Sequence, residues 1–566
     1  MELNRRLIVR TAAFCLLIVG VCYANSIHND FILDDFLIVA SNPDIRNITP
    51  VHFLLSPFWG EKGPAGIYRP LVILSFSIEY SIWHRWAPGF RLGNLLLHAI
   101  NGFLVFLLAR SLIGSIPAAW AATAVYLAHP VHTEAVAGIA GRSELLAAMF
   151  FFLAWLLFRQ RRTALCAVAF LLSLLSKENA IAFPAVIVLD TWISEGSFKK
   201  VLLEWRRFAL VASSAAVYLA LRLLALGFIA MPQSAQYLGG RWTLFEREFT
   251  SGRAFLKYFQ LLIAPVDVTG DYDFNSIPLA SPVNWDAWLG LMIVAATIIF
   301  AFRISRRQPV IGFAILFFYI TLLPVSNWIL PSGLIMAERY LYVPSFGFAL
   351  IAGMIWSSIR AKEIRRILAA GVMVFAALLC ISHNYIWQDN LTFYANMVRV
   401  LPENIRGRQG YGVALLDINR VPEAREQFEA GLRIARNAPL LVGLAGTRIR
   451  MEHHCGNARP LLNEALAIQQ NDYFARWSLA ECLEREGEMR AAEQTYRRAV
   501  GDAQFPDSRL LFDWGRTLER TSRPAEALQA YRRAALIDPN DFAIRQKVAR
   551  LSQPGPGGEG VGTPAP

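Results

Sequence analysis

The sequence predicts an all-α protein in two parts: a polytopic transmembrane helical bundle of about 11 spans, followed by an α-solenoid of helical hairpins. Three observations support this prediction. Hydrophobic residues make up 55% of the 566 residues and charged residues only 17%, which is too apolar for an ordinary soluble protein. Long apolar runs recur as far as residue 383, and a period of 34 or 35 residues begins after residue 400.

A membrane-spanning helix needs roughly 20 apolar residues. The first apolar run follows Arg5, Arg6 and Arg10 and has the form of a signal peptide, but Cys22-Tyr-Ala-Asn-Ser is a poor cleavage site, so we expect an uncleaved span. The candidate spans, of which those near 163–193 are the shortest, lie at about 7–24, 92–109, 115–130, 143–158, 163–176, 179–193, 208–226, 286–302, 310–327, 340–357 and 366–383.

The basic residues decide the predicted orientation, because positive charge is retained in the cytoplasm. The net charge of +12 lies in short clusters beside the apolar runs, which indicates membrane topology and not nucleic-acid binding. These clusters are the basic N-terminus, Arg159 to Arg162, Lys199 to Arg207, Arg303 to Arg307 and Arg360 to Arg366. If all eleven candidate spans cross the membrane, these clusters all fall on its cytoplasmic side. Because the number of spans is odd, the chain after Ile381 then lies on the non-cytoplasmic side.

Two long external loops result, at about 25–91 and 227–285. The first contains the apolar run Leu71 to Ile78, which is too short to span and predicts an interfacial helix. The predicted units are a transmembrane domain over 1–386, a juxtamembrane linker over 387–401, a repeat array over 402–548 and a disordered tail over 549–566, rich in Pro and Gly.

About four repeats are visible as three columns of residues spaced by 34 or 35 positions. The columns are Gly412, Gly446, Ala480 and Gly515; Ala424, Ala458, Ala492 and Ala527; and Phe428, Leu462, Tyr496 and Tyr531. Small residues let paired helices approach, and the larger column fills the seam with the next repeat. The end of the array, Ala534 to Asn540, resembles the end of a tetratricopeptide (TPR) unit.

The cysteines predict no disulfide framework. Four of the six lie in apolar runs, and the other two, Cys455 and Cys482, fall in different repeats.

Polar residues gather at the external boundary of the predicted bundle. They are Asp34, Asp35, His129, His132, Glu134, Arg142, Lys177, Glu178, Glu338 and Arg339. Any one of them, taken alone, is equally consistent with an interfacial anchor or a helix cap, and the two histidines with structural roles. Together, adjacent acids, a lysine and two arginines on one membrane face indicate a site that binds a phosphate and removes a proton.

Six sequence blocks, in this order and followed by TPRs, resemble the transmembrane-and-TPR-containing (TMTC) O-mannosyltransferases and their bacterial relatives in the GT-C superfamily. The blocks are NSIHNDFILDDF, YRPL, FRLGNLLLHAINGFLVF, HPVHTEAVAGIAGRSELL, LLSKENAIAFP and AERYLYVPSFGF. The resemblance implies a GT-C-like bundle that transfers a sugar, mannose or another hexose, from a polyprenyl-phosphate donor to an acceptor hydroxyl. The array is shorter than in the animal members.

The resemblance also implies roles for the site residues. Asp34 and Asp35 occupy the first-loop acidic motif, and we favour Asp35 as the base with Asp34 in support, leaving the reverse order open. Transfer would proceed with inversion. Lys177, Arg339 and then Arg142 are the candidates to bind the donor phosphate.

Four further residues are expected to support these groups. Glu178 and Glu338 would hold the cations, and Glu134 with His132 would shape the sugar pocket. We expect no metal and no cofactor, although the carboxylates are numerous enough to bind a divalent ion.

Two other function classes stay open: a transporter or flippase for a lipid-linked sugar, and a non-catalytic membrane scaffold whose TPRs recruit a partner. The expected partners are the lipid donor and an acceptor protein or glycan bound by the TPRs. We expect a bacterial inner-membrane protein with periplasmic TPRs, or lumenal TPRs in an endoplasmic reticulum membrane.

Overall fold

The computed structural model describes residues 4–553 except 41, 43, 47–48, 56, 59–65, 229–242, 273–275, 330–333, 453, 504–505 and 539–540. Within these residues every regular element is a helix, and one isolated antiparallel bridge joins Tyr272 to Met336. The all-α prediction is therefore confirmed. The chain forms two compact units, Met1–Asn404 and Ile405–Pro566.

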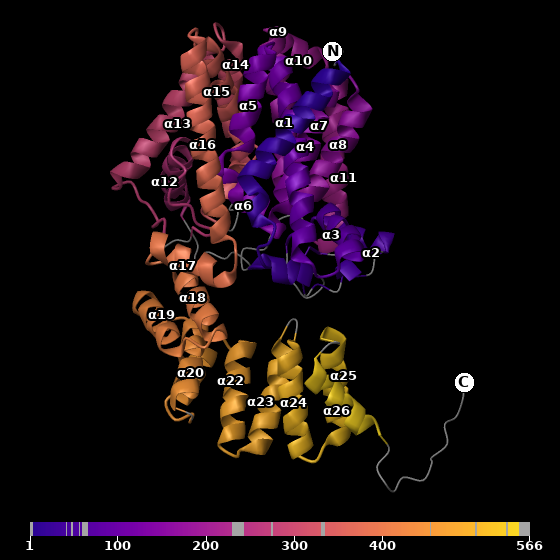
Figure 1. Cartoon of the computed structure of the whole chain (residues 1–566), viewed down its shortest axis with the longest axis vertical. Helices are drawn as coiled ribbons and strands as arrows, with labels where there is room; N and C mark the ends of the chain where they lie inside the picture. Colours follow the sequence, from indigo (N-terminus) through magenta and orange to yellow (C-terminus); the bar gives the residue numbers. More distant parts are fainter. Residues whose placement is uncertain are drawn as a thin grey trace, which may run out of the picture. The chain divides into compact units, whose positions relative to one another are not determined.

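The first unit is a helical bundle (Figure 1). Its α-helices are α1 (Arg5–Tyr23), α2 (Pro50–Leu55), α3 (Pro70–Trp83), α4 (Ala87–Ile113), α5 (Ile116–Leu127), α6 (Thr133–Ala137), α7 (Arg142–Arg159), α8 (Thr163–Ser176), α9 (Phe183–Glu195), α10 (Phe198–Leu203), α11 (Trp205–Leu226), α12 (Leu244–Ile263), α13 (Trp285–Ile304), α14 (Pro309–Leu322), α15 (Ser345–Ser358), α16 (Lys362–Ile386) and α17 (Asn390–Val400). Short turns between them include η2 (Phe36–Ala40), η4 (Pro130–His132), η5 (Ile139–Gly141), η6 (Glu178–Ala182) and η9 (Glu338–Leu341).

Six helical segments of the described chain are long and apolar enough to cross a membrane, which indicates a multi-pass integral membrane protein. They are Arg5–Ser26, Ala87–Ile113, Ile139–Arg159, Trp205–Leu226, Trp285–Ile304 and Lys362–Ile386. The predicted count of about eleven is not confirmed. Four other predicted spans correspond to apolar helices of 10–17 residues, and the span at 179–193 corresponds to the 13-residue α9.

The bundle is held together by close helix contacts. In α15, a Cβ at Gly347 would lie 2.3 Å from the carbonyl oxygen of Ala314 in α14, and one at Gly353 would lie 2.6 Å from that of Ala118 in α5. Only glycine permits both approaches, as is common where membrane helices cross. The indole of Trp155 is fully buried nearby and stacks on Phe317, with ring centroids 5.5 Å apart.

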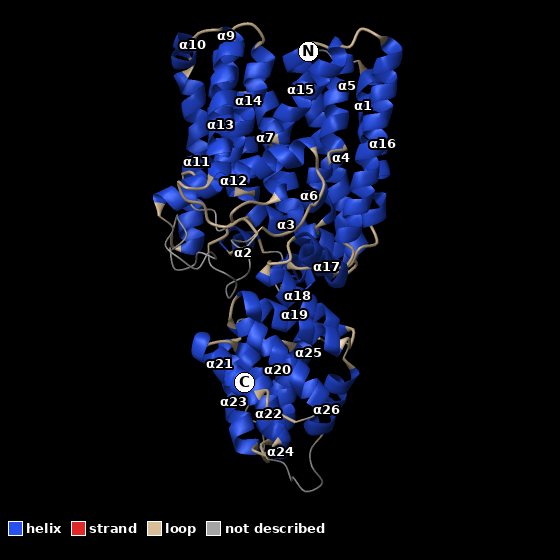
Figure 2. Ribbon diagram, turned by 90° about the vertical axis from the view of Figure 1, so that its left-hand side faces the viewer, coloured by secondary structure: helices blue, strands red, loops and turns tan. Residues whose placement is uncertain are grey.

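The two ends of the bundle carry different side chains. Helix α7 begins at Arg142 and ends at Arg159, whose guanidinium donates to Ser111 in the last turn of α4 (3.0 Å). Helix α4 has 27 residues and is therefore about 40 Å long, so its first turns lie far from this basic end. In both views α9, α10 and the N-terminus lie at one end of the bundle, and α2 and α17 at the other (Figures 1 and 2).

The predicted external loops are more ordered than their composition suggested. The run Leu71 to Ile78 lies in α3, which buries Val72 and Phe76 against the bundle. The second loop contains the 20-residue amphipathic helix α12, which was not predicted because Pro232, Gly239 and Gly240 precede it. Its capping box, formed by Thr243 and Glu246, was the sequence signal that could have revealed it. Those two glycines and Pro232 lie outside the described residues.

The segment predicted as a juxtamembrane linker, 387–401, is helical and belongs to the first unit. It contains α17, whose Phe393 and Met397 are buried against that unit. A Cβ at Gly270 would lie 2.2 Å from the ring of Phe393, so α17 packs directly on the second loop.

The second unit consists of stacked helical hairpins. Its helices are α18 (Ile405–Asp417), α19 (Val421–Ile434), α20 (Ala438–Glu452), α21 (Arg459–Ile468), α22 (Tyr473–Arg485), α23 (Met489–Asp502), α24 (Ser508–Arg520), α25 (Pro524–Ile537) and α26 (Phe542–Ser552). All members of the Ala424 and Phe428 columns are fully buried. The ring of Phe428 lies against Gly412 of its own hairpin and Gly443 of the next, as the repeat pattern predicts. Most of the predicted tail lies outside the described residues.

One expectation about the second unit is wrong, because the structure contains a disulfide between Cys455 and Cys482. Cys455 lies in the turn between α20 and α21, and Cys482 lies in α22, with 5.5 Å between their Cα atoms. No spacing in the sequence indicates this pair, because the pairing depends on how consecutive repeats stack. The other cysteines are free and buried.

We predict that this disulfide stabilises the TPR unit. The bond closes a sequence separation of 27 residues, for which restriction of the unfolded chain is worth roughly 3 kcal/mol. Replacing both cysteines with alanine should lower the denaturant concentration at which half of this unit is unfolded. Pulse proteolysis of the purified full chain measures that midpoint. Wild-type protein with the disulfide reduced should have the same midpoint as the double variant. Rapid maleimide labelling of both thiols in unreduced, folded protein would contradict the pairing.

Candidate active site

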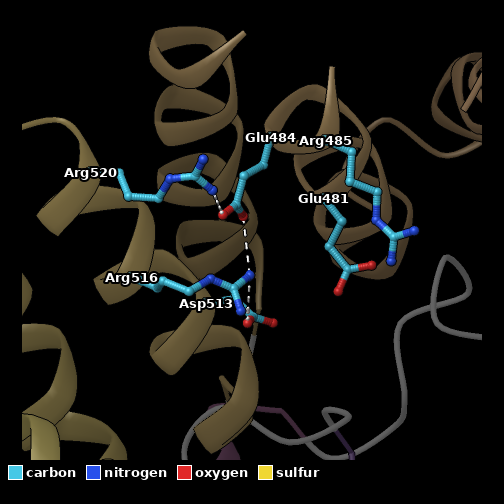
Figure 3. Close-up of a pocket in the computed structure, with 6 residues that line it drawn as sticks. All are labelled: Glu481, Glu484, Arg485, Asp513, Arg516 and Arg520. Carbon is cyan, nitrogen blue, oxygen red and sulfur yellow. Dashed lines mark hydrogen bonds and ion pairs between the residues drawn. The ribbon is translucent and has the colours of Figure 1, made fainter. Parts of the chain in front are cut away.

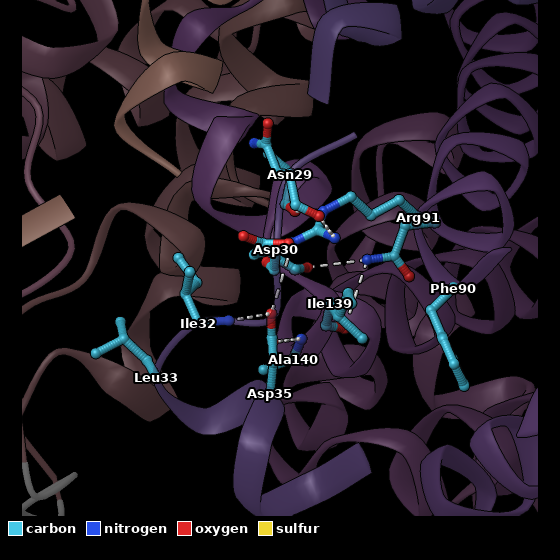
Figure 4. Close-up of polar contacts among 12 residues, drawn as sticks. Asn29, Asp30, Ile32, Leu33, Asp35, Phe90, Arg91, Ile139 and Ala140 are labelled. Atoms are coloured by element: carbon cyan, nitrogen blue, oxygen red, sulfur yellow. Dashed lines mark hydrogen bonds and ion pairs between the residues drawn. The ribbon is translucent and has the colours of Figure 1, made fainter. Parts of the chain in front are cut away.

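The segment from Asn29 to Asp35, which we call the acidic loop, folds tightly around the side chain of Asp35 (Figure 4). The side chain of Asp35 is 2% exposed. Its Oδ1 accepts the backbone N–H of Ala140 (2.8 Å) and its Oδ2 accepts that of Ile32 (3.3 Å). Arg91 completes the environment, with its Nη2 3.9 Å from Oδ2. Asp35 is therefore a buried, fully engaged carboxylate.

Arg91 ties this loop to the bundle. Its fully buried guanidinium projects from the first turns of α4 and donates to the carbonyl oxygens of Asn29 and Asp30, and through Nε to that of Ala137 (3.2 Å). The side chain of Arg91 thus joins the acidic loop to the segment from Ala137 to Ala140, whose last N–H donates to Asp35. We did not single out Arg91 from the sequence, although it lies in the FRLGN block.

Asp34 has the opposite placement, because its side chain is exposed. The preceding residue, Leu33, has φ +48°, a left-handed conformation that is rare for a branched side chain. The following residues form the π-helical turn η2, a feature found often at functional sites. Such strain and irregularity indicate that the surrounding structure fixes the direction of Asp34.

The electrostatics of Asp35 reflect its burial. Burial raises the pKa of Asp35 to about 6, although Arg91 and the two backbone N–H groups favour its charged form. The negative charge of Asp34 acts on both Asp35 and Arg339, so these groups lie within electrostatic range of one another. Of the two orders left open by the sequence, the one with Asp35 as the base assigns the proton transfer to the buried acid of the pair.

Lys177 lies beside α7 and is held by Glu144, not by Glu178 as expected from the sequence. Its Nζ forms a buried ion pair with Glu144 and lies 5.2 Å from the ring centroid of Tyr340. Burial lowers the pKa of Lys177 to about 8, while Glu144 opposes that shift. Glu144 belongs to the GRSELL block and was missed.

Arg339 is paired with Glu134, not with Glu338. Glu134 accepts both the guanidinium and the backbone N–H of Arg339 (2.7 Å), which fixes the start of η9. The side chain of Arg339 is 29% exposed, against 5% for Lys177. Arg339 is therefore the most accessible of the three predicted phosphate-binding cations, Lys177, Arg339 and Arg142.

Glu178 instead forms a two-pronged ion pair with Arg69, at 2.6 and 3.0 Å. Burial alone would raise the pKa of Glu178, but Arg69 and Lys177 lower it to about 2. Arg69 and Arg339 both act electrostatically on Lys177, so the three cations converge. Arg69 stands in the YRPL block but had been given no role.

Glu338 contacts no cation directly in the described structure. Its Oε1 accepts the N–H of Thr269 (2.8 Å) and the hydroxyl of Tyr272 (2.6 Å), which fastens η9 to the second loop. Burial, together with the nearby negative charge of Glu134, raises the pKa of Glu338 to about 8. Glu338 is thus neutral at pH 7.

Three other predicted site residues lie in the interior. Arg142 is 1% exposed and donates to Asn94 (2.6 Å) and to the carbonyl oxygen of Phe90 (2.6 Å), with Glu79 as its ion-pair partner (2.8 Å). His132 is fully buried, bonds to Ser345 (2.8 Å) and is surrounded by aromatic rings. His129 is also buried and bonds to the carbonyl oxygen of Leu262 (3.0 Å). These three side chains are buried and bonded to groups within the bundle.

The chain is similar in sequence to several known proteins. Protein O-mannosyl-transferase TMTC3 of Homo sapiens is 24% identical over 597 residues, which cover 94% of this chain and 65% of that protein. Protein O-mannosyl-transferase F38B6.6 of Caenorhabditis elegans is 26% identical over 435 residues, covering 73% and 61% respectively. The chain is a distant homologue of the TMTC protein O-mannosyl-transferases.

Another relative has a higher sequence identity over a shorter part of the chain. Protein O-mannosyl-transferase Tmtc2 of Drosophila melanogaster is 41% identical over 152 residues, or 26% of this chain and 16% of that protein. The chain spans less than two thirds of the length of the first relatives. No family model matches it. The solved structure of YrrB, a TPR protein, aligns to 34% of this chain and 95% of that one with 20% identity and a TM-score of 0.22, too low to support structural inference.

The site as a whole offers an exposed carboxylate beside a cluster of cations held by carboxylates. Such a cluster can stabilise negative charge that develops on a leaving phosphate, and the exposed acid can accept a proton. Within the described residues no group of three or more His, Cys, Asp or Glu side chains is arranged to hold a metal ion.

The TPR unit contains a second candidate site, a pocket of about 390 Å³ between α22 and α24 (Figure 3). Glu484 lies at its centre and accepts from Arg516 (3.2 Å) and Arg520 (2.8 Å). Glu481, Arg485 and Asp513 complete its lining. A groove of mixed charge suits a polypeptide, whose side chains and backbone supply both donors and acceptors.

The raised pKa of Glu338 predicts a pH dependence of stability. The unfolded chain releases this proton near pH 4.5, and the folded protein retains it to about pH 8, so folding stability is lost as the pH rises between these values. Glu338→Gln keeps the oxygen that accepts from Thr269 and Tyr272 but cannot ionise. The variant should lose less thermal stability than wild type between pH 6 and pH 9.

The matched control is Glu363→Gln, which removes an exposed glutamate on α16 and should behave as wild type. Equal losses of melting temperature in wild type and Glu338→Gln would contradict the assignment of a retained proton to Glu338.

Proposed function

We propose that this protein is a membrane glycosyltransferase that transfers a hexose, most simply mannose, from a polyprenyl-phosphate donor to an acceptor hydroxyl. The observation that supports this most is the exposed Asp34 on a fixed loop, within electrostatic range of Arg339, in a chain related to O-mannosyl-transferases over 94% of its length. The donor would be a membrane lipid, consistent with a site at one end of apolar helices.

Asp34 is the proposed base. The acceptor oxygen attacks the anomeric carbon, its proton passes to Asp34, and the bond from that carbon to the phosphate oxygen breaks on the opposite face of the sugar with inversion. Asp35 is the positioning carboxylate, because its oxygens are already occupied by Ala140, Ile32 and Arg91. This reverses the order favoured from the sequence.

The cations stabilise the departing phosphate, which gains negative charge as the bond breaks. Arg339 is the most exposed of them and can form two parallel bonds to phosphate oxygens. Lys177 lies deeper, and Arg69 joins them from the first loop. Because Glu134 and Glu144 hold Arg339 and Lys177 before the donor arrives, little reorganisation is needed during the reaction.

We place the site and the TPR unit on the non-cytoplasmic side of the membrane, in the periplasm of a bacterium or the lumen of the endoplasmic reticulum. The Cys455–Cys482 disulfide supports this, because such bonds persist in oxidising compartments. Basic clusters near the other helix ends agree with cytoplasmic retention. The TPR pocket around Glu484 would bind the acceptor protein or a partner that delivers it.

The catalytic prediction concerns the two acids. Asp34→Asn should lower sugar transfer from a labelled polyprenyl-phosphate mannose at least a hundredfold, with unchanged melting temperature, because the exposed amide cannot accept a proton. Asp35→Asn should lower both transfer and melting temperature, because it weakens the buried contacts with Arg91 and Ala140. Purified, monodisperse variants are compared for transfer and for donor binding.

Glu363→Gln is the control, since it removes an exposed carboxylate of α16 that has no contact with the acidic loop among the described bonds, and it should leave transfer unchanged. Wild-type rates in Asp34→Asn would remove Asp34 from catalysis. Donor movement across vesicles by a wild type that transfers no sugar would favour a flippase.

The topological prediction follows from the charge distribution. Alkaline phosphatase should be active when fused after Pro566 and inactive when fused after Arg162, and green fluorescent protein should show the reverse. Active phosphatase after Arg162, or fluorescence after Pro566, would place the acidic site and the TPR unit in the cytoplasm and contradict the proposal.

A further inference from the structure

The chain that leaves the last long helix returns to the acidic loop. We call residues 384–397, the end of α16 and most of α17, the strap. The backbone carbonyl oxygen of Gln388 accepts the N–H of Asp30 (2.9 Å), and that of Asn384 accepts the side-chain amide of Asn29 (3.0 Å). The side-chain Oδ1 of Asn390 accepts the N–H of Leu33 (3.3 Å). The loop is therefore bonded to the strap at three residues, Asn29, Asp30 and Leu33.

Apolar packing reinforces these bonds. Ile32 of the loop, Ala137 of the bundle, and Trp387, Phe393 and Met397 of the strap form one buried cluster. The indole of Trp387 also covers Gly138, where a Cβ would lie 3.3 Å from the ring. The strap thus packs both on the acidic loop and on the turn whose Ala140 N–H binds Asp35.

Asn390 has a particular place in this arrangement. It bonds Leu33, whose backbone has φ +48°, and Leu33 directly precedes Asp34. A leucine leaves the left-handed conformation readily when nothing holds it there. Any such change would rotate the following peptide and alter the direction of the exposed carboxylate of Asp34.

We propose that Asn390 is a positioning residue for catalysis, which acts by holding Leu33 so that Asp34 points at the reacting sugar. This inference rests on the proposed transferase function and adds a residue of the strap to its machinery. The strap lies more than 340 residues along the chain from the acidic loop, in a segment whose composition predicted only a linker.

The experiment compares three variants of the full chain. Asn390→Ala removes the acceptor oxygen, Asn390→Asp retains one at the same position, and Arg399→Ala changes an exposed side chain of the same helix whose described bond stays within α17. Asn390→Ala should lower kcat for sugar transfer by about tenfold to a hundredfold with the KM for donor unchanged, because misplacing a reacting group by about 1 Å costs that much. Asn390→Asp should recover most of the loss, and Arg399→Ala should match wild type.

Hydrogen exchange followed by mass spectrometry supplies a readout that does not depend on activity. Peptides covering residues 30–36 should exchange faster in Asn390→Ala than in wild type, Asn390→Asp or Arg399→Ala. Unchanged exchange would overturn the proposal, as would a wild-type kcat in Asn390→Ala. A raised KM with unchanged kcat would also overturn it, because the residue would then act on donor binding.

The two proposals fail in different ways. If wild type transfers no sugar, the transferase function is lost, and faster exchange in Asn390→Ala still supports the strap as the element that holds the acidic loop. If wild type transfers sugar and Asn390→Ala does so equally well, only the positioning role is lost.

Discussion

The buried guanidinium of Arg91 is the constraint on which the site depends. An arginine taken from water must be fully paired, and here three backbone carbonyl oxygens and the carboxylate of Asp35 surround it. The loop and the turn at Ala137 can satisfy this charge only when both are in place. Both oxygens of Asp35 are occupied by these contacts, while its neighbour Asp34 lies at the surface. The backbone beside Asp34 is held by Arg91 and by Asn390.

The positive charges of the cation cluster are also balanced by nearby negative groups. Lys177, Arg339 and Arg69 each have a carboxylate partner, so the cluster is close to neutral and its cations have fixed positions. A phosphate would enter at Arg339, where exposure is greatest among the three. Glu338 stays neutral at pH 7 and adds no negative charge to the cluster. The arrangement favours an anion while keeping the desolvation cost of three positive charges low.

The sequence predicted the membrane bundle, the repeat array and most of the charged residues at the site, because each leaves a local pattern. It did not predict which charges pair, since Glu144 and Glu134 approach Lys177 and Arg339 only through the packing of α7 and η9. It also missed the Cys455–Cys482 bond and the contact between Asn390 and Leu33, which depend on tertiary structure. Six of the eleven predicted spans correspond to helices that are long enough to cross a membrane. The other five correspond to shorter apolar helices, because apolar composition alone does not determine helix length.

The most direct test of the central claim is an experimental structure of the full chain with a non-transferable polyprenyl-phosphate sugar analogue bound. The account predicts that the phosphate contacts Arg339 and lies next to Lys177, with the anomeric carbon facing the carboxylate of Asp34 and not that of Asp35. A phosphate bound at the other end of the bundle, among the basic residues near Arg159, would contradict the account, as would a sugar that does not approach the acidic loop.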